Sequence, residues 1–170
     1  MKSQSEPAVL VALAELLAPG RPQIVAAVRR ATEGTSEDSA WDVLYEQLRE
    51  PDDDGPPLTV GFDWKEDPGN VPEYLRTLSS YPAALTWDWF EPSVAEFVEL
   101  EWHAGEIMEG LLPEVGEQCL RVGVALMCFP VGDSYEVCFA NADAAERITE
   151  LAAGIGREND LFVLREGVFD

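Results

Sequence analysis

Residues 120–140 are the most apolar stretch of this chain, and a turn signal lies in the middle of them. Alternate side chains of a strand point to opposite faces. A strand here would place Val122, Val124, Leu126 and Cys128 on one face and Gly123, Ala125, Met127 and Phe129 on the other. Because neither face is polar, both faces need cover. Pro130 and Gly132 then favour a reversal, since proline ends the donation of ladder hydrogen bonds and glycine readily takes a positive φ. The sequence therefore predicts a buried β-hairpin at the centre of a sheet.

Helices and further strands are expected on both sides of this hairpin. Before residue 50, the spacing of apolar residues predicts three helices, the third capped by Ser36 or Ser39. Helices are also expected at 71–79, 93–112 and 142–153, strands at 58–64, 84–89 and 161–164, and a connector at 113–118. Two segments have an alternative, because 84–89 also fits a tight aromatic loop and 98–102 alternates like a strand.

This order of elements predicts one α+β domain, in which about six helices cover a central antiparallel or mixed sheet. We expect an N-terminal helical segment (1–50), a loop rich in Pro and Asp (51–57) and an α+β core (58–170). A chain of 170 residues is long enough to bury a core without disulfides or metal. Its hydrophobic content of 46% excludes a disordered chain.

The formal net charge of −22 exceeds the ~2 to 8 charges that keep a small domain soluble. Self-repulsion on this scale costs stability, so the excess indicates either an acidic proteome or a basic partner that the surface attracts. The same charge disfavours nucleic acid and anionic membranes, because phosphate groups are held by Lys and Arg. We therefore expect a basic protein partner, no nucleic acid and no membrane.

The cysteines Cys119, Cys128 and Cys138 are odd in number and lack Cys-x-x-Cys spacing. We expect small buried hydrophobes in a reducing compartment, with a bridge from Cys128 to Cys138 across the hairpin as the alternative. No run reaches the ~20 apolar residues that span a bilayer. The predicted location is the cytoplasm.

Aromatic and acidic residues adjoin each other at two predicted strand ends. The first pair is Asp63 with Trp64, and the second group is Trp87, Asp88, Trp89 and Glu91. Trp is a frequent interface anchor and binds cations over its ring, so both groups suit recognition of a basic surface. The structural alternative is that Trp packs the sheet edge while Asp caps the following turn.

A continuous acidic block follows the second aromatic group. Residues 77–120 contain no Lys or Arg, whereas the N-terminal helices contain Arg21, Arg29, Arg30 and Arg49. The molecule is therefore expected to be electrically lopsided. We add Glu96, Glu99 and Glu106 of this block to the predicted partner-binding residues.

Candidates for catalysis are few. If 93–112 is one helix, Glu99, His103 and Glu106 share a face, as a metal site or an acid–base pair requires. Further ligands would have to come from another element, and the chain has no second histidine. Motifs for an activated Ser nucleophile and for a phosphate-binding glycine loop are absent from the sequence. We expect no enzyme, no cofactor and no metal.

Three short motifs carry a resemblance: Trp41-x-x-Leu44, Phe62-Asp63-Trp64-Lys65 and Asp133-Ser134-Tyr135. Between about Trp41 and Leu164 the chain resembles an uncharacterised group of bacterial α+β proteins. Its acidic character is similar to that of immunity proteins, which neutralise secreted antibacterial toxins. The resemblance implies a binding protein rather than an enzyme and brings no catalytic residues.

These observations together predict an acidic protein-binding module. Its most concrete form is an immunity protein that occupies the basic active site or surface of a cognate bacterial toxin. One alternative is a small-ligand or housekeeping domain with proteome-level acidity. The other is a metal-dependent hydrolase that uses Glu99, His103 and Glu106.

Overall fold

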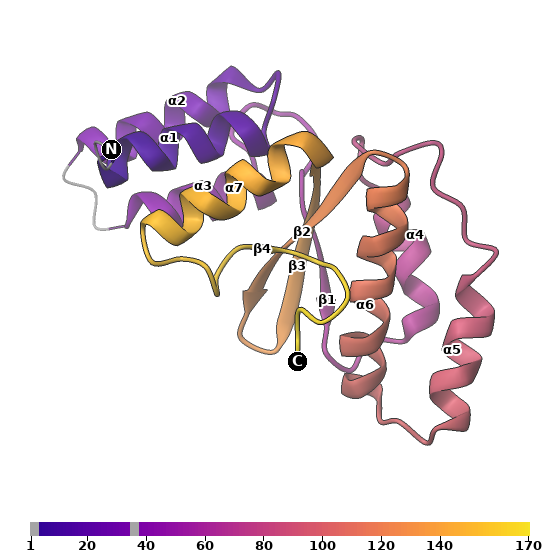
Figure 1. The fold of residues 1–170 in the computed structure, drawn as a ribbon. Coiled ribbons are helices and arrows are strands. Elements are labelled where there is room, and N and C mark those ends of the chain that lie inside the picture. The colour runs from indigo at the N-terminus through magenta and orange to yellow at the C-terminus, as the bar shows by residue number, and fades with distance from the viewer. Residues whose placement is uncertain (1–3, 35–37) are drawn as a thin grey trace.

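The computed structural model describes residues 4–34 and 38–170 (Figure 1). Within these residues, seven α-helices and one short 3-10 helix pack on a four-stranded sheet with the strand order β1-β3-β2-β4. The helices are α1 (Glu6–Leu17), α2 (Pro22–Glu33), α3 (Ala40–Arg49), η1 (Pro68–Asn70), α4 (Val71–Arg76), α5 (Phe90–Glu99), α6 (Ala104–Arg121) and α7 (Ala142–Gly154), and the strands are β1 (Val60–Asp63), β2 (Val124–Val131), β3 (Ser134–Asn141) and β4 (Phe162–Val163). Every pair of neighbouring strands is antiparallel, which confirms the predicted α+β class.

The predicted central hairpin is confirmed. β2 and β3 pair along their whole length, from Val124 opposite Asn141 to Val131 opposite Ser134. Gly132 lies in the two-residue turn between them with a φ of 57°, a left-handed conformation that favours glycine. β1 and β4 flank the hairpin, so its two strands form the middle of the sheet.

The sheet separates two cores, as the lack of a polar face on β2 predicts. Ala125, Met127 and Phe129 belong to the core beneath α1, α2, α3 and α7. Leu126 and Cys128 belong to the opposite core, beneath α4, α5 and α6. Figure 1 shows these two helical layers on opposite sides of the strands, with α5 outermost in its layer. We call the layer of α1, α2, α3 and α7 the N-terminal layer.

All three cysteines are buried and free. Cys128 and Cys138 lie in opposite cores, so the alternative of a bridge between them is wrong. Burial raises the pKa of each thiol, which keeps it protonated and unreactive near neutral pH. These side chains act as small hydrophobes, as expected.

Local capping signals account for the start of two helices. The Ser39 hydroxyl accepts a hydrogen bond from Asp42 N–H at 3.1 Å, and the Asn141 side chain accepts one from Asp143 N–H at 2.9 Å. The other candidate cap, Ser36, lies outside the described residues. The loop at 51–57 is tied to the N-terminal layer by an ion pair between Arg21 and Asp53.

The expected strand at 84–89 is wrong, and the alternative of an aromatic loop is correct. Trp87 and Trp89 stack with ring centroids 5.8 Å apart, and both contact Phe90 edge-on. Each indole N–H donates locally, from Trp87 to the Tyr81 hydroxyl at 2.7 Å and from Trp89 to Thr86 O at 2.9 Å. These contacts fold the segment on itself instead of pairing it with the sheet.

The expected single helix over 93–112 is also wrong, because the chain turns between α5 and α6. Trp102 N–H donates to Phe97 O at 3.2 Å and Glu101 N–H donates to Val98 O at 3.0 Å, which is the Schellman pattern of a helix end. Glu101 takes the left-handed position of this motif with a φ of 57°. The Trp102 and Phe97 rings stack at 4.8 Å and supply its hydrophobic contact. The strand alternative at 98–102 is therefore wrong too.

The expected connector at 113–118 lies inside α6. Pro113 removes one helical hydrogen bond, but it is buried in a helix whose Leu111, Leu112 and Val115 are fully buried against the sheet. Tertiary packing of this apolar face stabilises the helix across the proline.

Candidate protein-binding surface

The helix that begins the predicted acidic block, α5, is mostly exposed. Phe90 is its one fully buried side chain. Phe97 is half-buried, and the Ser93 hydroxyl donates to Glu114 Oε1 of α6 at 2.8 Å. The carboxylates of Glu91, Glu96 and Glu99 face solvent. The helix is thus fixed along one side by α6 and presents its acidic side outward.

A groove with a volume of about 920 Å³ lies between α5 and the segment of η1 and α4. It brings together three predicted residues, Trp87, Asp88 and Glu91. Asp67 and Glu73 add two further carboxylates, and Phe90 and Val94 add apolar surface. The groove combines an aromatic wall with acids, so it can hold an apolar side chain that ends in a positive charge.

The Trp87 ring already carries a cation. The guanidinium carbon of Arg76 lies 5.9 Å from the ring centroid, within the range of a cation–π contact. Trp89 stacks on Trp87 and is half-buried, but it is not among the residues that line the groove. Sequence reasoning missed Arg76 and α4 as parts of the site, since no local signal places residue 76 beside residue 87.

The first predicted pair, Asp63 and Trp64, lies away from this groove at the end of β1. Asp63 Oδ1 accepts a hydrogen bond from Lys65 N–H at 2.8 Å, which matches the structural alternative of a turn cap. The Trp64 ring lies over Gly105 at the start of α6, where an added Cβ would stand 2.3 Å from a ring carbon. Lys65 Nζ lies 4.6 Å from the Trp64 ring centroid. Trp64 is 38% exposed, so its ring remains accessible.

Glu99, His103 and Glu106 do not share a helical face. Glu99 ends α5, His103 precedes α6, and Glu106 lies in the first turn of α6. Glu106 Oε2 accepts a hydrogen bond from His103 N–H at 2.7 Å and so caps the helix start. Among residues 4–34 and 38–170, no group of three His, Cys, Asp or Glu side chains is arranged to hold a metal ion. The turn at Glu101 therefore separates Glu99 from His103 and Glu106, the three residues of the metal-site hypothesis.

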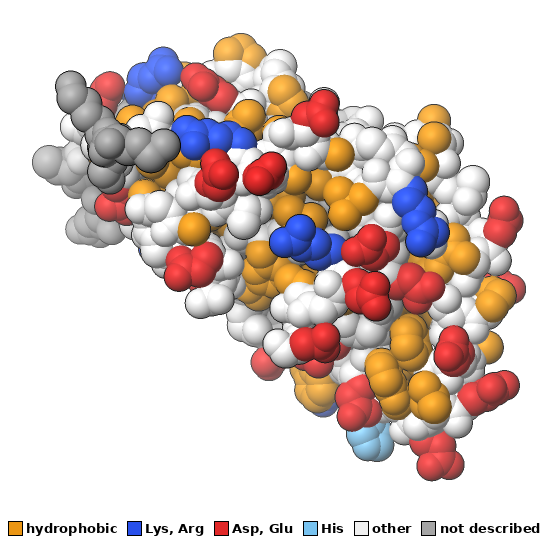
Figure 2. Space-filling view, viewed as in Figure 1, with side chains coloured by type: hydrophobic (Ala, Val, Ile, Leu, Met, Phe, Trp, Pro, Cys, Tyr) orange, Lys and Arg blue, Asp and Glu red, His pale blue; other side chains and the backbone are white. Residues whose placement is uncertain are grey.

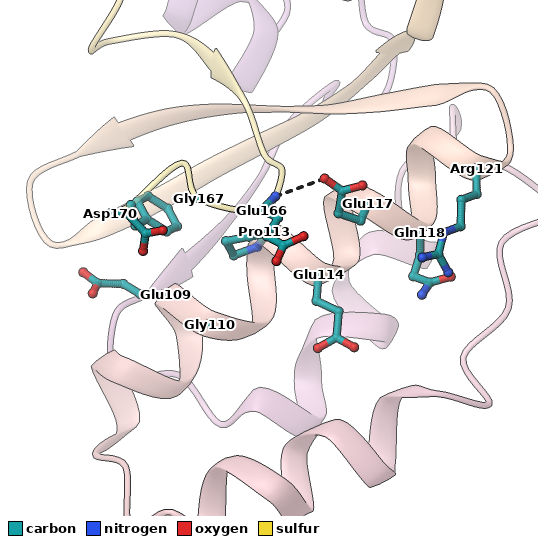
Figure 3. Close-up of a pocket in the computed structure, with 11 residues that line it drawn as sticks. Glu109, Gly110, Pro113, Glu114, Glu117, Gln118, Arg121, Glu166, Gly167 and Asp170 are labelled. Atoms are coloured by element: carbon teal, nitrogen blue, oxygen red, sulfur yellow. Dashed lines mark hydrogen bonds between the residues drawn. The ribbon is translucent and has the colours of Figure 1, made fainter.

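A second groove, of about 520 Å³, separates α6 from the segment 166–170 (Figure 3). Its acidic lining consists of Glu109, Glu114, Glu117, Glu166 and Asp170. Glu109 and Asp170 lie at one end and Arg121 at the other, while Glu117 Oε1 accepts a hydrogen bond from Glu166 N–H at 3.1 Å. This groove could not be expected from the sequence, because the sequence predicts a connector at 113–118. Glu114 and Glu117 line the groove together because α6 continues through this segment.

Tyr135 of β3 contacts two residues that line this second groove. Its hydroxyl donates to Glu109 Oε1 at 3.3 Å, and its ring lies 5.5 Å from that of Phe169. Burial and the nearby Glu109 carboxylate raise the pKa of Tyr135 to about 12. The phenol is therefore neutral at physiological pH and acts as a hydrogen-bond donor.

Within residues 4–34 and 38–170, the carboxylates of α5 and α6 have no cationic partner. In the part of the chain that the structure describes, no ion pair involves a residue of either helix. The ion pairs Arg21–Asp53, Arg147–Glu150 and Arg157–Asp160 are all associated with the N-terminal layer. Figure 2 shows red side chains around an orange patch over α5 and α6. The predicted electrical asymmetry is therefore clearest in the ion pairs: among the described residues, they are associated with the N-terminal layer and none involves α5 or α6.

The chain belongs to the family described as a domain of unknown function, DUF6630, whose model matches residues 9–162. The search of curated proteins and the search of solved structures returned no match. None of the helices in the described residues is both long enough and apolar enough to cross a membrane.

Proposed function

We propose that this protein is an acidic binding module for a basic protein partner, which docks on the face formed by α5, α6 and the groove beside α4. The observation that carries the proposal is the set of α5 and α6 carboxylates that have no cationic partner in the described residues. A basic surface would relieve their mutual repulsion, and long-range attraction would speed its approach.

In its most specific form, the proposal is an immunity protein that blocks the active site of a basic bacterial toxin. Carboxylates on α5 would take the place of substrate phosphates in a cationic cleft, and the Trp87 groove would receive an apolar or cationic side chain. The partner-binding residues proposed on this face are Trp87, Asp88, Trp89, Glu91, Glu96 and Glu99, with Asp63, Trp64 and Glu106 at its border.

The experiment compares two charge reversals of equal size on a partner isolated by affinity purification. One variant carries Glu91→Lys, Glu96→Lys and Glu99→Lys; the control carries Glu15→Lys, Glu46→Lys and Glu146→Lys on exposed positions of the N-terminal layer. We expect the first to slow association about tenfold or more at low salt, within the range of electrostatic steering, and the control to have little effect. Surface plasmon resonance at several salt concentrations measures both rates. The proposal is overturned if the partner is acidic or if only the control variant slows binding.

The immunity role has a separate test. If the isolated partner kills a bacterial host when expressed alone, co-expression of this protein should restore growth, and the α5 triple reversal should abolish protection. A harmless basic partner would reject the immunity role while leaving the binding function intact.

One observation favours a second candidate, a small-ligand domain. The volume of the groove beside Trp87, about 920 Å³, falls within the range of small-molecule sites. An aromatic or aliphatic ammonium would suit its lining, because the carboxylates of the groove attract the charge and its apolar side chains contact the rest of the compound. Isothermal titration with such compounds, compared with Trp87→Leu protein, distinguishes this function from protein binding.

A further inference from the structure

The end of α5 and the turn that follows it expose three large apolar side chains close together in sequence. Val98 is 60% exposed, Leu100 57% and Trp102 38%. Solitary exposed apolar residues are common, but a contiguous patch ringed by polar groups is typical of an interaction site. The residues between and around them are acids: Glu96, Glu99, Glu101 and Glu106. We call Val98, Leu100 and Trp102 the apolar corner.

Hydrogen bonds and a ring stack fix the backbone of the apolar corner and its Trp102 side chain. The Schellman hydrogen bonds from Glu101 and Trp102 fix the backbone, and the Trp102 ring stacks on Phe97 at 4.8 Å. Gly110 of α6 leaves room for this stack, since an added Cβ there would stand 2.7 Å from a Trp102 ring carbon. A rigid apolar surface binds with a smaller loss of conformational entropy than a mobile one.

Charge decides which occupant fits the apolar corner. A second copy of this chain would bring its own ring of carboxylates against the first, and like charges at an interface cost free energy. An anionic lipid surface is repelled for the same reason. A protein segment with apolar side chains flanked by Lys or Arg matches both the patch and its acidic border.

We infer that the apolar corner is the anchor site for such a segment of the protein partner. The inference rests on the proposed function and assigns a specific contact to it. Apolar side chains of the partner cover Val98, Leu100 and the exposed part of Trp102, while its cations meet Glu96, Glu99 and Glu101. In this arrangement the surrounding carboxylates govern association and the apolar corner governs dissociation.

The test uses a fluorescein-labelled peptide of twelve residues built from the repeat Lys-Leu-Leu-Lys. A second peptide has Ser in place of Leu, and a third has Glu in place of Lys. We expect the first peptide to bind at least tenfold more tightly than the other two in fluorescence anisotropy. In the amide NMR spectrum, its largest shifts should fall on residues 97–103.

The decisive variant is Val98→Ser with Leu100→Ser, and its matched control is Val131→Ser. Val131 is 44% exposed in the hairpin and lies outside the corner, so the control repeats the Val98→Ser exchange on another apolar surface. The double variant should weaken binding of the Lys-Leu-Leu-Lys peptide about tenfold, whereas the control should bind as the parent does. Because the exchanged side chains are exposed, both proteins should keep the parent amide spectrum elsewhere.

Three outcomes would overturn the inference. Unchanged affinity in the double variant would show that the corner contributes nothing, and equal binding of the Lys-Ser peptide would leave only electrostatic attraction. Shifts confined to residues 87–91 and 73–76 would place the peptide in the Trp87 groove, so the proposed function would stand while this inference failed. If neither of the two cationic peptides binds at low salt, both fail.

Discussion

Helices α1 and α5 have similar lengths but opposite relations to the rest of the molecule. α1 has twelve residues, of which Val9, Leu10, Leu13, Ala14 and Leu17 are buried. α5 has ten residues, and only Phe90 is fully buried. The apolar face of α1 is buried in the core. In contrast, Val98 at the end of α5 and Leu100 in the following turn are exposed.

This difference separates the residues that stabilise the fold from those free to bind. A fully buried Leu contributes ~1.5–3 kcal/mol to folding relative to an exposed one, so α1 is a major source of stability. The exposed side chains of α5 contribute little to the folded state, because they remain in water before and after folding. Substitutions on α5 are therefore expected to report on binding, and substitutions on α1 to report on stability.

The largest expected effect is the loss of a core side chain from α1. Leu13→Ala removes a fully buried residue, and we expect it to lower the free energy of unfolding by about 2–5 kcal/mol. Val98→Ala on α5 should change it by less than about 0.5 kcal/mol, because Val98 is mostly exposed. Urea denaturation followed by Trp fluorescence measures both values. Equal losses in the two variants would contradict the comparison.

The second prediction concerns a close approach between α6 and the chain after β4. A Cβ added at Gly116 would stand 1.9 Å from Leu164 O, a backbone atom that cannot move independently. Gly116→Ala should therefore destabilise the protein by about 2–3 kcal/mol, although alanine is normally the better helix former.

Its matched control is Gly154→Ala in the last position of α7, where an added Cβ meets nothing within 4 Å. This variant should be neutral or more stable by up to about 1 kcal/mol. Thermal unfolding of the two proteins gives the signs directly. Tolerance of alanine at 116 would show that the 164–166 segment lifts away from α6 readily.

The hairpin and the helix caps could be predicted because each depends on a local signal. A strand without a polar face must be central, and Asn141 stands immediately before a helical pattern. The turn between α5 and α6 could not be predicted, because the left-handed position of its Schellman motif holds Glu101 where a sequence search expects glycine. Once that turn was missed, the metal-site hypothesis at Glu99, His103 and Glu106 followed from a helical spacing that does not exist.

The two grooves of the candidate surface could not be predicted from the sequence for a different reason. One joins Arg76 to Trp87 and Glu91, and the other joins Glu114 and Glu117 to Glu166. These residues meet only because α4, α5, α6 and the chain after β4 pack on one side of the sheet. Composition identified the acidic block correctly, but packing determines which of its carboxylates face a groove.

The third prediction tests the strain at the turn that exposes the apolar corner. A non-glycine residue in the left-handed region costs ~1–2 kcal/mol, and Glu101 is held there with a φ of 57°. Glu101→Gly should therefore raise the free energy of unfolding by about 0.5–1 kcal/mol, part of the gain being offset by the freedom of glycine in the unfolded chain. Urea denaturation measures this change. Glu96→Gly, inside α5, should be destabilising by a similar amount, and the same sign in both variants would contradict the assignment of strain to residue 101.

The smallest expected effect distinguishes a carboxylate paired with the N-terminal layer, that of Asp53 in the loop 51–57, from an unpaired one of α5. The hydrogen bond from Arg21 lowers the pKa of Asp53 below its ordinary value of 3.8, while the same pairing raises the pKa of Arg21. The unfolded chain then binds more protons than the folded one at acidic pH, so the stabilisation by Asp53 is present above pH 3.8 and is lost as the pH falls through the lowered pKa. Asp53→Asn should therefore be less stable than the parent at pH 7, and the difference should shrink below about pH 4. Urea denaturation of both proteins between pH 7 and the acid limit of folding measures the difference. Glu96 of α5 has no ion pair in the described residues, so the control Glu96→Gln should not be less stable than the parent at pH 7. A gap between parent and Asp53→Asn that stays constant with pH would show that the ion pair with Arg21 does not stabilise the fold, and the contrast between paired and unpaired carboxylates would then lose its energetic basis.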